Sequence, residues 1–397
     1  MRKKILFLTN LLPYPPDNGG KIKTLSVLTA LSKSGLDITL VCFSEDNQGM
    51  VSDFLDQNTI RIQKLICLKK DLTTSSNLIK MSFIAARSLF SKLPFSVMKY
   101  KSLKLSRVLK KLCKQESYDL VYFDHLQMMV FEKNITTVEK KLLDEHNCES
   151  ELAKQRLAQT NNWLKRRFLK IEYKKLCKFE SKALRDVDHV ILLSDQDKKL
   201  LIHVANRDFN CDIIPISVKD RGVKSYRTNI DSLRILFLGT LTWEPNIRGI
   251  EWFINKVMPF TKNVELIVAG RGLDKRLERE NVHILGYVEN LDKIYDECDI
   301  MIVPLFMGSG QRVKIIEAYS KGMPVITTTI GVEGLVYANG ENVLIADNKE
   351  EFLSAIDAIA RNDNYLKLAR GARRTYEDYY SEAIIESKII ASIDSLM

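Results

Sequence analysis

Residues 307–324 read MGSGQRVKIIEAYSKGMP, and this stretch decides how the rest of the chain is interpreted. It begins with Gly308, Ser309 and Gly310, a flexible turn in which the glycines leave room for backbone N–H groups to approach a ligand. The next letters, IIEAYS, predict a helix, and the N-terminus of a helix carries a partial positive charge that suits phosphate. A glycine turn at the start of a helix therefore predicts a site for an anion.

Three charged side chains follow the glycine turn. Arg312 and Lys314 place two cations at the start of the predicted helix, and Glu317 lies further along it. The cations suit a phosphate group, and the carboxylate of Glu317 suits hydroxyl groups of the same ligand. An ordinary strand-to-helix loop with a solvated basic edge has the same composition, so the surrounding sequence must decide between the two interpretations.

Size and composition indicate a globular protein of two domains. At 397 residues the chain is too long for one ordinary core, and its 45% hydrophobic and 28% charged residues are typical of globular proteins. The sequence has no uncharged apolar run long enough to span a membrane. Its seven cysteines are dispersed without paired CxxC spacing, which favours a reducing, cytoplasmic environment over disulfides or a zinc site.

The formal net charge of the chain is +10, and residues 154–185 form a notably basic segment. Its lysines and arginines alternate with Trp163, Leu164, Phe168, Leu169, Leu176 and Phe179. A basic helix with such residues can lie on an anionic membrane surface, which would place the protein peripherally at the inner face of the membrane. A solvated helix whose apolar stripe packs on its own domain explains the pattern as well. We expect no nucleic-acid partner, because no motif of a standard nucleic-acid module is present.

The first half of the chain alternates short apolar strands with helical patterns. Its predicted strands are residues 4–9, 37–43, 61–67, 119–123, 141–144, 189–193 and 211–214. A strand, a loop at residues 13–20, a helix and a second strand open the series, and such units build parallel sheets. Because ligands bind at the carboxyl ends of parallel strands, Gly19 and Gly20 occupy a ligand-facing position. The GxGxxG spacing of a dinucleotide site is absent, so we expect no cofactor of that kind.

Histidines and carboxylates follow two of these strands. Asp124 and His125 follow one predicted strand, and Asp144, Glu145 and His146 stand at the end of the next. Both histidines thus lie at the carboxyl edge of the predicted sheet, where an imidazole can contact a ligand or transfer a proton. A histidine at a strand end also serves as an ordinary structural hydrogen-bonding group, and that interpretation stays open.

The second half repeats this organisation after a polar segment. Residues 218–233 lack periodicity, which is typical of a linker between domains. Predicted strands follow at residues 234–238, 264–269, 282–285, 299–303, 324–327 and 343–345. Gly239, Gly270 and Gly286 stand just past the first three, where a ligand or another backbone can approach closely. Residues 350–397 have a helical pattern long enough to pack across both halves.

Three segments resemble the retaining nucleotide-sugar glycosyltransferases of the family 4 type. They are ILFLTNLLPYPPDNGGKIKT, RILFLGTLTWEPNIRGIEWF and PLFMGSGQRVKIIEAYSKGMPVITTTIGVEGL. The third is the most specific, because the glycine loop, the helical EA, KGMPV and IGVEGL occur together in the family order. The resemblance covers nearly the whole chain. It implies an α/β fold of the GT-B type, with two Rossmann-like domains facing across a cleft and a C-terminal helix packing across both.

The resemblance divides the chain into four parts. Residues 1–217 are expected to form an N-terminal Rossmann-like domain on the acceptor side, and residues 218–233 a linker. Residues 234–375 are expected to form a C-terminal Rossmann-like domain that binds the nucleotide sugar. Residues 376–397 would then form a helix that returns to the N-terminal domain.

The resemblance also implies roles for individual residues. Glu317 would bind the ribose hydroxyls, Gly286 with its two successors would lie beside the base, and residues 308–310 would contact the donor sugar. The residues implied to bind the donor are Gly19, Gly20, Gly239, Arg248, Gly270, Gly286, Tyr287, Val288, Gly308, Ser309, Gly310 and Arg312. Such enzymes generally need no divalent metal, because cations and backbone amides neutralise the leaving phosphates.

The implied reaction requires positive charge on its leaving group. Breaking a sugar–phosphate bond creates an oxocarbenium-like sugar and a nucleotide diphosphate anion. Arg312 and Lys314 are the first candidates to stabilise this anion, and Arg248 is the third. The expected catalytic residues are His146, Glu317 and Lys314. The expected acceptor-side or secondary residues are His125, Asp144 and Glu145.

Two positions depart from the family pattern. Many members have two glutamates separated by seven residues, and here the first of these positions is Ser309, which has no carboxylate. Thr240 replaces the arginine that usually follows the first strand of the second domain. These departures keep two alternatives open, namely a catalytically weakened nucleotide- or glycan-binding subunit and a nucleotide-sugar epimerase. The main expectation is a retaining, metal-independent glycosyltransferase that modifies a glycan or lipid-linked acceptor in cell-surface polysaccharide biosynthesis.

Overall fold

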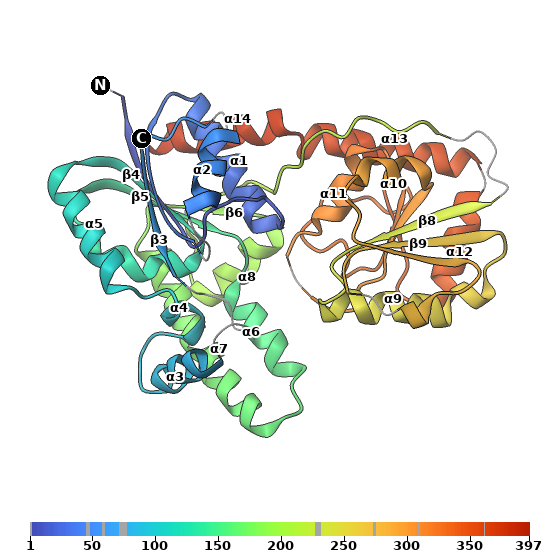
Figure 1. Cartoon of the computed structure of the whole chain (residues 1–397), viewed down its shortest axis with the longest axis horizontal. Coiled ribbons are helices and arrows are strands. Elements are labelled where there is room, and N and C mark those ends of the chain that lie inside the picture. The colour runs from blue at the N-terminus through green and yellow to red at the C-terminus, as the bar shows by residue number, and fades with distance from the viewer. Residues whose placement is uncertain are drawn as a thin grey trace. The chain divides into compact units, whose positions relative to one another are not determined.

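The computed structural model describes residues 2–44, 48–57, 60–70, 78–226, 232–272, 275–308, 310–360 and 362–397. The chain divides into two compact units, and Figure 1 colours it by residue number from blue at the N-terminus to red at the C-terminus. Met1–Pro215 and Glu386–Met397 form the first unit, and Ile216–Ile385 form the second. In this division residues 218–226, which we expected in a linker, belong to the second unit.

The first unit is built on a parallel sheet with the strand order β3-β2-β1-β4-β5-β6-β7. Its described strands are β1 (Lys4–Thr9), β2 (Asp37–Ser44), β3 (Lys64–Lys69), β4 (Tyr118–Asp124), β5 (Val138–Glu145), β6 (His189–Leu192) and β7 (Cys211–Ile213). The central strands are continuous apolar runs because a parallel sheet has both of its faces covered. Thr9, Asp124 and Asp144 pair in register at the carboxyl ends of β1, β4 and β5.

Helices connect these strands. The described helices of the first unit are α1 (Gly19–Lys33), α2 (Gln48–Gln57), α3 (Leu78–Leu89), α4 (Phe95–Met98), α5 (Leu103–Gln115), the 3-10 helix η1 (Leu126–Asn134), α6 (Glu149–Ala158), α7 (Trp163–Arg185) and α8 (Asp195–Ala205). The loop that we predicted at residues 13–20 has the wrong C-terminal bound, because Gly19 and Gly20 form the first turn of α1. The side chain of Asn18 caps this helix by accepting the backbone N–H of Lys21 at 3.1 Å.

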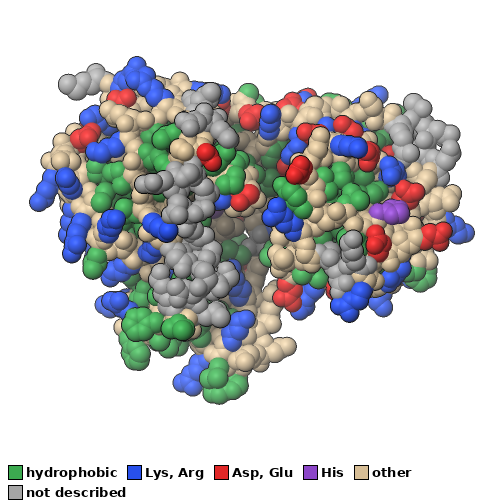
Figure 2. All heavy atoms as spheres, in the orientation of Figure 1, with side chains coloured by type: hydrophobic (Ala, Val, Ile, Leu, Met, Phe, Trp, Pro, Cys, Tyr) green, Lys and Arg blue, Asp and Glu red, His purple; other side chains and the backbone are tan. Residues whose placement is uncertain are grey.

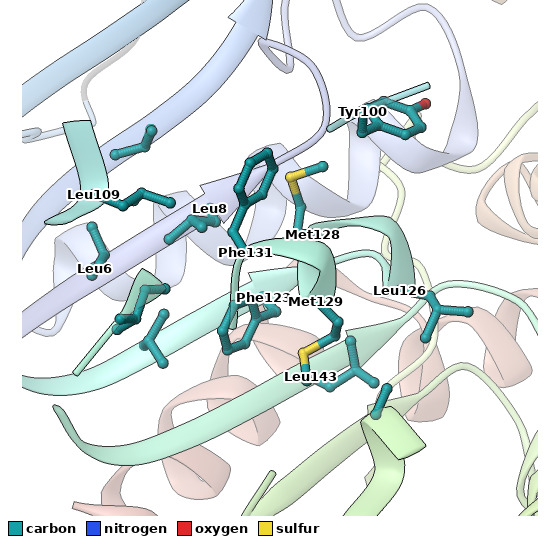
Figure 3. Close-up of a cluster of buried hydrophobic side chains, with 14 of the residues drawn as sticks. Leu6, Leu8, Tyr100, Leu109, Phe123, Leu126, Met128, Met129, Phe131 and Leu143 are labelled. Carbon is teal, nitrogen blue, oxygen red and sulfur yellow. The ribbon is translucent and has the colours of Figure 1, made fainter. Parts of the chain in front are cut away.

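The hydrophobic core of the first unit holds η1 against the sheet (Figure 3). Leu8 of β1 and Phe123 of β4 pack with Met128, Met129 and Phe131 of η1, and all five side chains are buried. Because η1 follows His125 directly, this packing fixes the chain where it leaves β4.

The second unit also contains a parallel sheet, with the strand order β10-β9-β8-β11-β12-β13. Its described strands are β8 (Leu233–Leu238), β9 (Val264–Ala269), β10 (Val282–Gly286), β11 (Ile300–Val303), β12 (Val325–Thr327) and β13 (Leu344–Ile345). Successive side chains of β8 enter two separate core clusters, since Ile235 and Phe237 belong to one and Leu236 to the other. The predicted α/β class with two parallel sheets is confirmed.

Helices cover both faces of the second sheet. Those described are α9 (Glu244–Lys256), η2 (Met258–Phe260), η3 (Lys275–Leu277), α10 (Leu291–Glu297), α11 (Val313–Ser320), α12 (Lys349–Ala360) and α13 (Asn362–Tyr379). Helix α14 (Glu382–Leu396) follows them and lies mostly in the first unit. The helical pattern predicted over residues 350–397 therefore corresponds to α12, α13 and α14. From Glu386 onward the chain belongs to the first unit, where the carboxylate of Glu386 lies 2.6 Å from the ammonium of Lys33.

The basic segment at residues 154–185 spans the end of α6 and all of α7. Leu176, Ala183 and Leu184 of α7 are buried in the core of the first unit. Trp163 and Leu164, at the start of α7, are 68% and 60% exposed. The C-terminal half of this helix thus packs on its own unit, while its N-terminal end presents apolar side chains to solvent.

Candidate functional site

The glycine turn lies between β11 and α11 in the second unit. The backbone φ is 111° at Gly308 and 82° at Gly310, a conformation that residues other than glycine rarely adopt. A Cβ atom on Gly308 would stand 3.1 Å from the ring of Trp243 and 3.3 Å from the guanidinium of Arg312. The turn therefore needs glycine at both positions. Ser309, the residue between them, lies outside the described part of the chain.

Lys314 lies in the first turn of α11 and directs its ammonium group to the end of β8. Its Nζ donates a hydrogen bond of 2.9 Å to Oδ1 of Asn246, a residue that is 3% exposed. A Cβ atom on Gly239 would stand 2.7 Å from this Nζ, so a glycine there leaves the space that the lysine occupies. Burial, followed by the charge of Arg312, lowers the pKa of Lys314 to about 7, with Glu317 acting in the opposite sense.

Arg312 is buried immediately before α11, with 5% of its surface exposed. Its Nη1 donates a hydrogen bond of 2.7 Å to the carbonyl oxygen of Gly310. Burial lowers the pKa of Arg312 to about 10, and Glu333 partly opposes this effect. Lys314 forms no ion pair with any described carboxylate. Two cations thus lie together in a poorly hydrated place, which is an arrangement that suits an anionic ligand.

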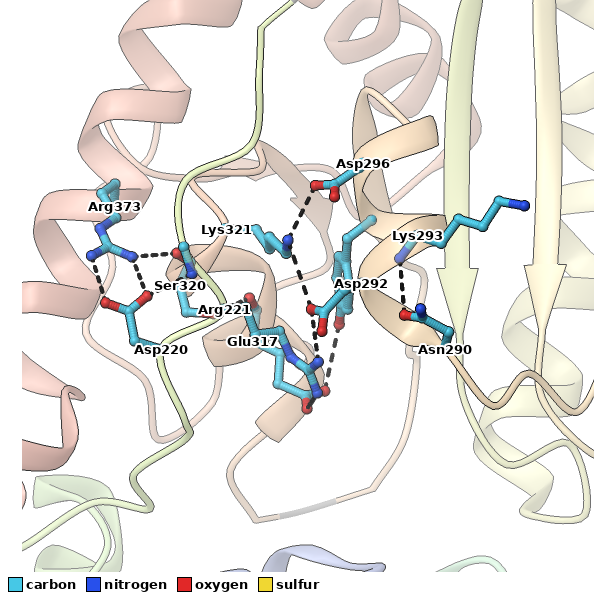
Figure 4. Close-up of polar contacts among 12 residues, drawn as sticks. Asp220, Arg221, Asn290, Asp292, Lys293, Asp296, Glu317, Ser320, Lys321 and Arg373 are labelled. Atoms are coloured by element: carbon cyan, nitrogen blue, oxygen red, sulfur yellow. Dashed lines mark hydrogen bonds and ion pairs between the residues drawn. The ribbon is translucent and has the colours of Figure 1, made fainter.

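Glu317 lies one turn further along α11, where two hydrogen-bond donors hold its carboxylate (Figure 4). Nη2 of Arg221 donates to one oxygen at 2.9 Å, and the hydroxyl of Tyr295 lies 3.5 Å from the other. Arg221 also pairs with Asp292 at 3.0 Å, and Asp292 lies 3.7 Å from the ammonium of Lys321. The sequence indicated Glu317 but not Arg221, because Arg221 belongs to the polar stretch that we expected to be a linker.

Three predicted glycines bring the ends of β8, β9 and β10 together. A Cβ atom on Gly270 would stand 1.8 Å from the carbonyl oxygen of Gly239, and the N–H of Gly270 donates to the carbonyl of Gly286 at 2.7 Å. Close backbone packing therefore requires glycine at position 270, whatever the ligand. Tyr287, directly after β10, is 61% exposed, whereas Val288 packs against the core.

Arg248 does not reach the cations of α11. It lies on α9 with 63% of its side chain exposed and forms an ion pair with Glu244, one turn earlier on the same helix. Asn246, two residues before it, instead makes the contact with Lys314. Asn246 could not be identified from the sequence, because its amide contacts Lys314 across 68 residues of chain.

Asp124 is the centre of a second cluster, which lies at the carboxyl edge of the sheet in the first unit. One oxygen accepts hydrogen bonds from the hydroxyls of Thr9 at 2.6 Å and Thr24 at 2.8 Å. That oxygen lies 3.1 Å from Nδ1 of His125, and the other oxygen lies 2.8 Å from Nε2 of His146. Although burial opposes ionisation, the charges and hydrogen bonds of the two histidines hold the pKa of Asp124 well below its usual value.

The two predicted histidines stack face to face, with ring centroids 3.7 Å apart. Burial disfavours charge on His125, but Asp124 outweighs burial and raises its pKa. Burial and the charge of His125 lower the pKa of His146. We therefore assign the proton of the pair to His125, so that neutral His146 donates through Nε2 to Asp124 and leaves Nδ1 as an acceptor. This Nδ1 is buried and has no hydrogen-bond partner among the described residues.

Gly20 lies against the free edges of both rings. A Cβ atom on Gly20 would stand 3.4 Å from Nε2 of His125 and 3.8 Å from Nδ1 of His146. His125 itself has a φ of 77°, a conformation that is costly for a residue with a side chain. The structure thus brings Gly20, which we predicted to face a ligand, together with the predicted histidines in one strained, polar site.

The two neighbouring carboxylates differ in their surroundings. Asp144 accepts a hydrogen bond of 2.6 Å from the hydroxyl of Tyr122 and forms a buried ion pair of 2.9 Å with Lys23. Glu145 is 1% exposed, and neither of its oxygens has a hydrogen-bond partner among the described residues. Burial, followed by the charge of Glu180, raises the pKa of Glu145 well above its usual value. Fixed partners therefore hold Asp144 in place, whereas burial disfavours the ionised form of Glu145.

Asp124, His125 and His146 each offer one potential metal-ligand atom, and these atoms lie within 4.8 Å of one another. Both Asp124 oxygens already accept hydrogen bonds, and each histidine turns one ring nitrogen to that carboxylate. The arrangement is that of a carboxylate that orients two imidazoles, which can then present one N–H donor and one nitrogen acceptor to a substrate.

The stretch of chain that carries the α11 site is similar to a family of glycosyltransferases. Residues 232–362, which include β8, the glycine turn and α11, match the family model described as Glycosyl transferases group 1. The resemblance predicted from sequence is confirmed over this stretch. Among the described residues, every helix is too short or too polar to cross a membrane.

Comparisons over the full length confirm the expected GT-B fold class. Sucrose-phosphate synthase (tll1590) from Thermosynechococcus elongatus matches with a TM-score of 0.72 and 14% identity, covering 100% of this chain and 99% of its own. Anabaena Alr3699/HepE in complex with UDP and glucose matches with a TM-score of 0.67 and 14% identity, covering 100% of both chains. In sequence, the "Uncharacterized 44.6 kDa protein in cps region" of Klebsiella pneumoniae is 24% identical over 405 residues, which cover 97% of this chain and 98% of the relative.

Proposed function

We propose that this protein is a retaining glycosyltransferase that takes its sugar from a nucleotide-sugar donor. The observation that carries the proposal is the cation pair at the start of α11. Arg312 is buried, and the ammonium of Lys314 is hydrogen-bonded to the neutral amide of Asn246. Two adjacent, poorly hydrated like charges destabilise the free protein, and a bound diphosphate would offset that cost.

The surroundings of these cations suit the leaving group of the reaction. Gly308 and Gly310 leave the backbone accessible just before the N-terminus of α11, and that helix end carries partial positive charge. Negative charge grows on the diphosphate as the sugar–phosphate bond breaks, so fixed donors placed there stabilise the transition state more than the ground state. Lys314 and Arg312 can do this without a divalent metal, and we propose that the reaction needs none.

Glu317 is proposed to bind the ribose hydroxyls of the donor. A carboxylate has about four acceptor positions, and Arg221 and Tyr295 use two of them. The remaining positions are available to two neighbouring hydroxyls. Arg221 is then a positioning residue, since it fixes the orientation of the carboxylate without contacting the donor.

The histidine pair of the first unit is proposed to contact the transferred sugar or the acceptor. His125 offers Nε2–H as a donor, and His146 offers Nδ1 as an acceptor. A sugar hydroxyl, which both donates and accepts, matches these two groups. His146 could also accept the proton of an acceptor hydroxyl as the new bond forms, because its lowered pKa leaves the imidazole uncharged near pH 7.

A surface glycan or a lipid-linked glycan is the proposed acceptor. The Klebsiella relative is described as a protein in a cps region, which supports a role in cell-surface polysaccharide synthesis. The Anabaena structure holds UDP and glucose, so UDP-glucose is the first donor to test.

A donor panel tests the proposal. We expect one nucleotide sugar to raise the thermal midpoint of the wild-type protein, because a ligand that binds the folded state stabilises it by mass action. The same donor should be hydrolysed slowly in the absence of acceptor, with release of the nucleoside diphosphate, in buffer that contains EDTA. Binding without any such release would indicate the nucleotide-binding subunit instead. With an acceptor, an NMR spectrum of the product should show the anomeric configuration of the donor.

A further inference from the structure

Helix α3 presents large apolar side chains to solvent along one side. Ile79 is 86% exposed, Phe83 is 68% exposed, and Phe90, directly after the helix, is 95% exposed. Residues spaced by four and by eleven positions lie on the same side of a helix. Met81 and Ser88, on the other side, are buried. The helix is thus attached to the first unit by a narrow face, and its aromatic and aliphatic stripe points outward.

A second group of exposed apolar residues, Trp163 and Leu164, begins α7. Contacts between α7 and the chain around α3 and α4 place the two groups on one part of the first unit. Glu172 of α7 accepts the backbone N–H of Phe95 at 2.7 Å, and Phe168 packs edge-on against the ring of Phe95. Figure 2 shows apolar side chains and interspersed Lys and Arg gathered at this end of the unit, where Figure 1 places α3 and the start of α7.

Two segments of this region carry charge of one sign. Residues 78–115 contain no Asp or Glu, and residues 152–171 contain none either. The cationic residues of these two segments are Lys80, Arg87, Lys92, Lys99, Lys101, Lys104, Arg107, Lys110, Lys111, Lys114, Lys154, Arg156, Lys165, Arg166, Arg167 and Lys170. Arg87, Lys92, Arg166 and Arg167 are exposed and lie within four residues of these apolar side chains in the sequence.

We propose that Ile79, Phe83, Phe90, Trp163 and Leu164, with the cations around them, form a docking surface for an anionic lipid bilayer. Apolar side chains on the outer side of a helix partition below the headgroups, while Lys and Arg pair with anionic headgroups. Groups of exposed large apolar side chains that are rimmed by polar residues mark interaction sites. The sequence had suggested a membrane surface along residues 154–185, and the structure moves it to α3 and the first turn of α7.

A second copy of the chain fits this surface less well. The cores of protein interfaces are depleted in lysine, and pairing two copies through the same patch would bring like charges together. A bilayer supplies both an apolar phase and the opposite charge. The inference goes beyond the proposed transfer reaction and does not depend on it, because docking is measured without any sugar donor.

Vesicle co-sedimentation of the full chain tests the docking surface. We expect binding to vesicles of phosphatidylcholine with about one-third phosphatidylglycerol, little binding to phosphatidylcholine alone, and weakening as salt rises. The double variant Phe83→Ser/Phe90→Ser should bind at least about tenfold more weakly. Phe260→Ser is the matched control, since Phe260 is a 60% exposed phenylalanine of the second unit. All changed side chains are exposed, so the variants should fold.

The charge and depth of docking are tested separately. Arg167→Glu should reduce binding to anionic vesicles several-fold at low salt, whereas Lys388→Glu, an exposed reversal on α14, should not. Brominated lipids should quench the fluorescence of the wild type more than that of Trp163→Phe. The proposal is overturned if the wild type does not bind anionic vesicles or if Phe83→Ser/Phe90→Ser binds them as well as the wild type does. It is also overturned if light scattering shows that this double variant converts a lipid-free dimer to a monomer.

Discussion

Replacing Lys314 by methionine should stabilise the free protein while it weakens donor binding. The pKa of this lysine falls from 10.5 to about 7 on folding. A tenfold change in the acid dissociation constant corresponds to about 1.4 kcal/mol. The charged lysine therefore costs the folded state a few kcal/mol, and after allowance for its partial exposure we expect Lys314→Met to gain about 2–4 kcal/mol at pH 7.

The gain should depend on pH in a defined direction. Between pH 7 and 10.5 the unfolded chain keeps the lysine proton that the folded chain has released, so the stability of the wild type rises with pH across this window. Methionine carries no proton, and the advantage of Lys314→Met should therefore shrink as pH rises from 7 toward 10.5. Below pH 7 the advantage should be constant.

Scanning calorimetry of the ligand-free proteins at pH 7 and pH 9 measures this difference. For a unit of the size of Ile216–Ile385, 1 kcal/mol shifts the midpoint by about 2–4 °C. Lys256→Met removes an exposed lysine from the end of α9 and should leave the midpoint unchanged. A lower midpoint for Lys314→Met, or an advantage that does not change with pH, would refute the reasoning about the buried cation pair.

Three further substitutions have distinct expected outcomes. Glu317→Gln should weaken donor binding at least about tenfold and release Arg221. Arg221→Lys should lower the donor affinity less. If a calorimetric titration showed equal donor affinity for Glu317→Gln and wild type, Glu317 would not belong to the ribose site. Glu145→Gln should be as stable as wild type near pH 4.5 and increasingly more stable than wild type as pH rises, because the unfolded carboxyl ionises at a lower pH than the folded one. Urea unfolding at pH 5 and pH 8 checks this, and a constant difference contradicts it. Arg248→Met should change donor affinity less than about twofold, since this side chain is exposed and paired with Glu244; a large loss would mean that the arginine binds the donor.

The fold could be predicted from local patterns because the strands are short apolar runs with clear ends. The strands at residues 4–9 and 264–269 have the predicted bounds. The start of α1 was missed, because glycine has a low helix propensity and Gly19–Gly20 suggested a loop. The cap provided by Asn18 and the packing of α1 on the sheet outweigh that propensity.

Parts of the two sites could be predicted because the sequence places polar residues at strand ends and glycines at a helix start. The partners of these residues could not be predicted. Arg221 and Glu317 are 96 residues apart, and Lys314 and Asn246 are 68 apart. No local pattern encodes contacts across such distances.

The exposure of individual residues could not be predicted from the sequence either. The pattern of α3 does not say which side of the helix faces the core, so the outward stripe of Ile79 and Phe83 emerged from the structure. The same limit applied to residues 154–185, where a single basic helical pattern covers both the buried Leu176 and the exposed Trp163.

The central claim is that the cations at the start of α11 hold the diphosphate of a sugar donor. Isothermal titration calorimetry at pH 6.5, with the nucleotide sugar that the donor panel selects, tests it most directly. We predict that wild type and Lys256→Met bind this donor equally and that Lys314→Met binds it about 10–100-fold more weakly, as expected for the loss of a hydrogen bond from a charged donor. Equal affinity of Lys314→Met and wild type would contradict the account.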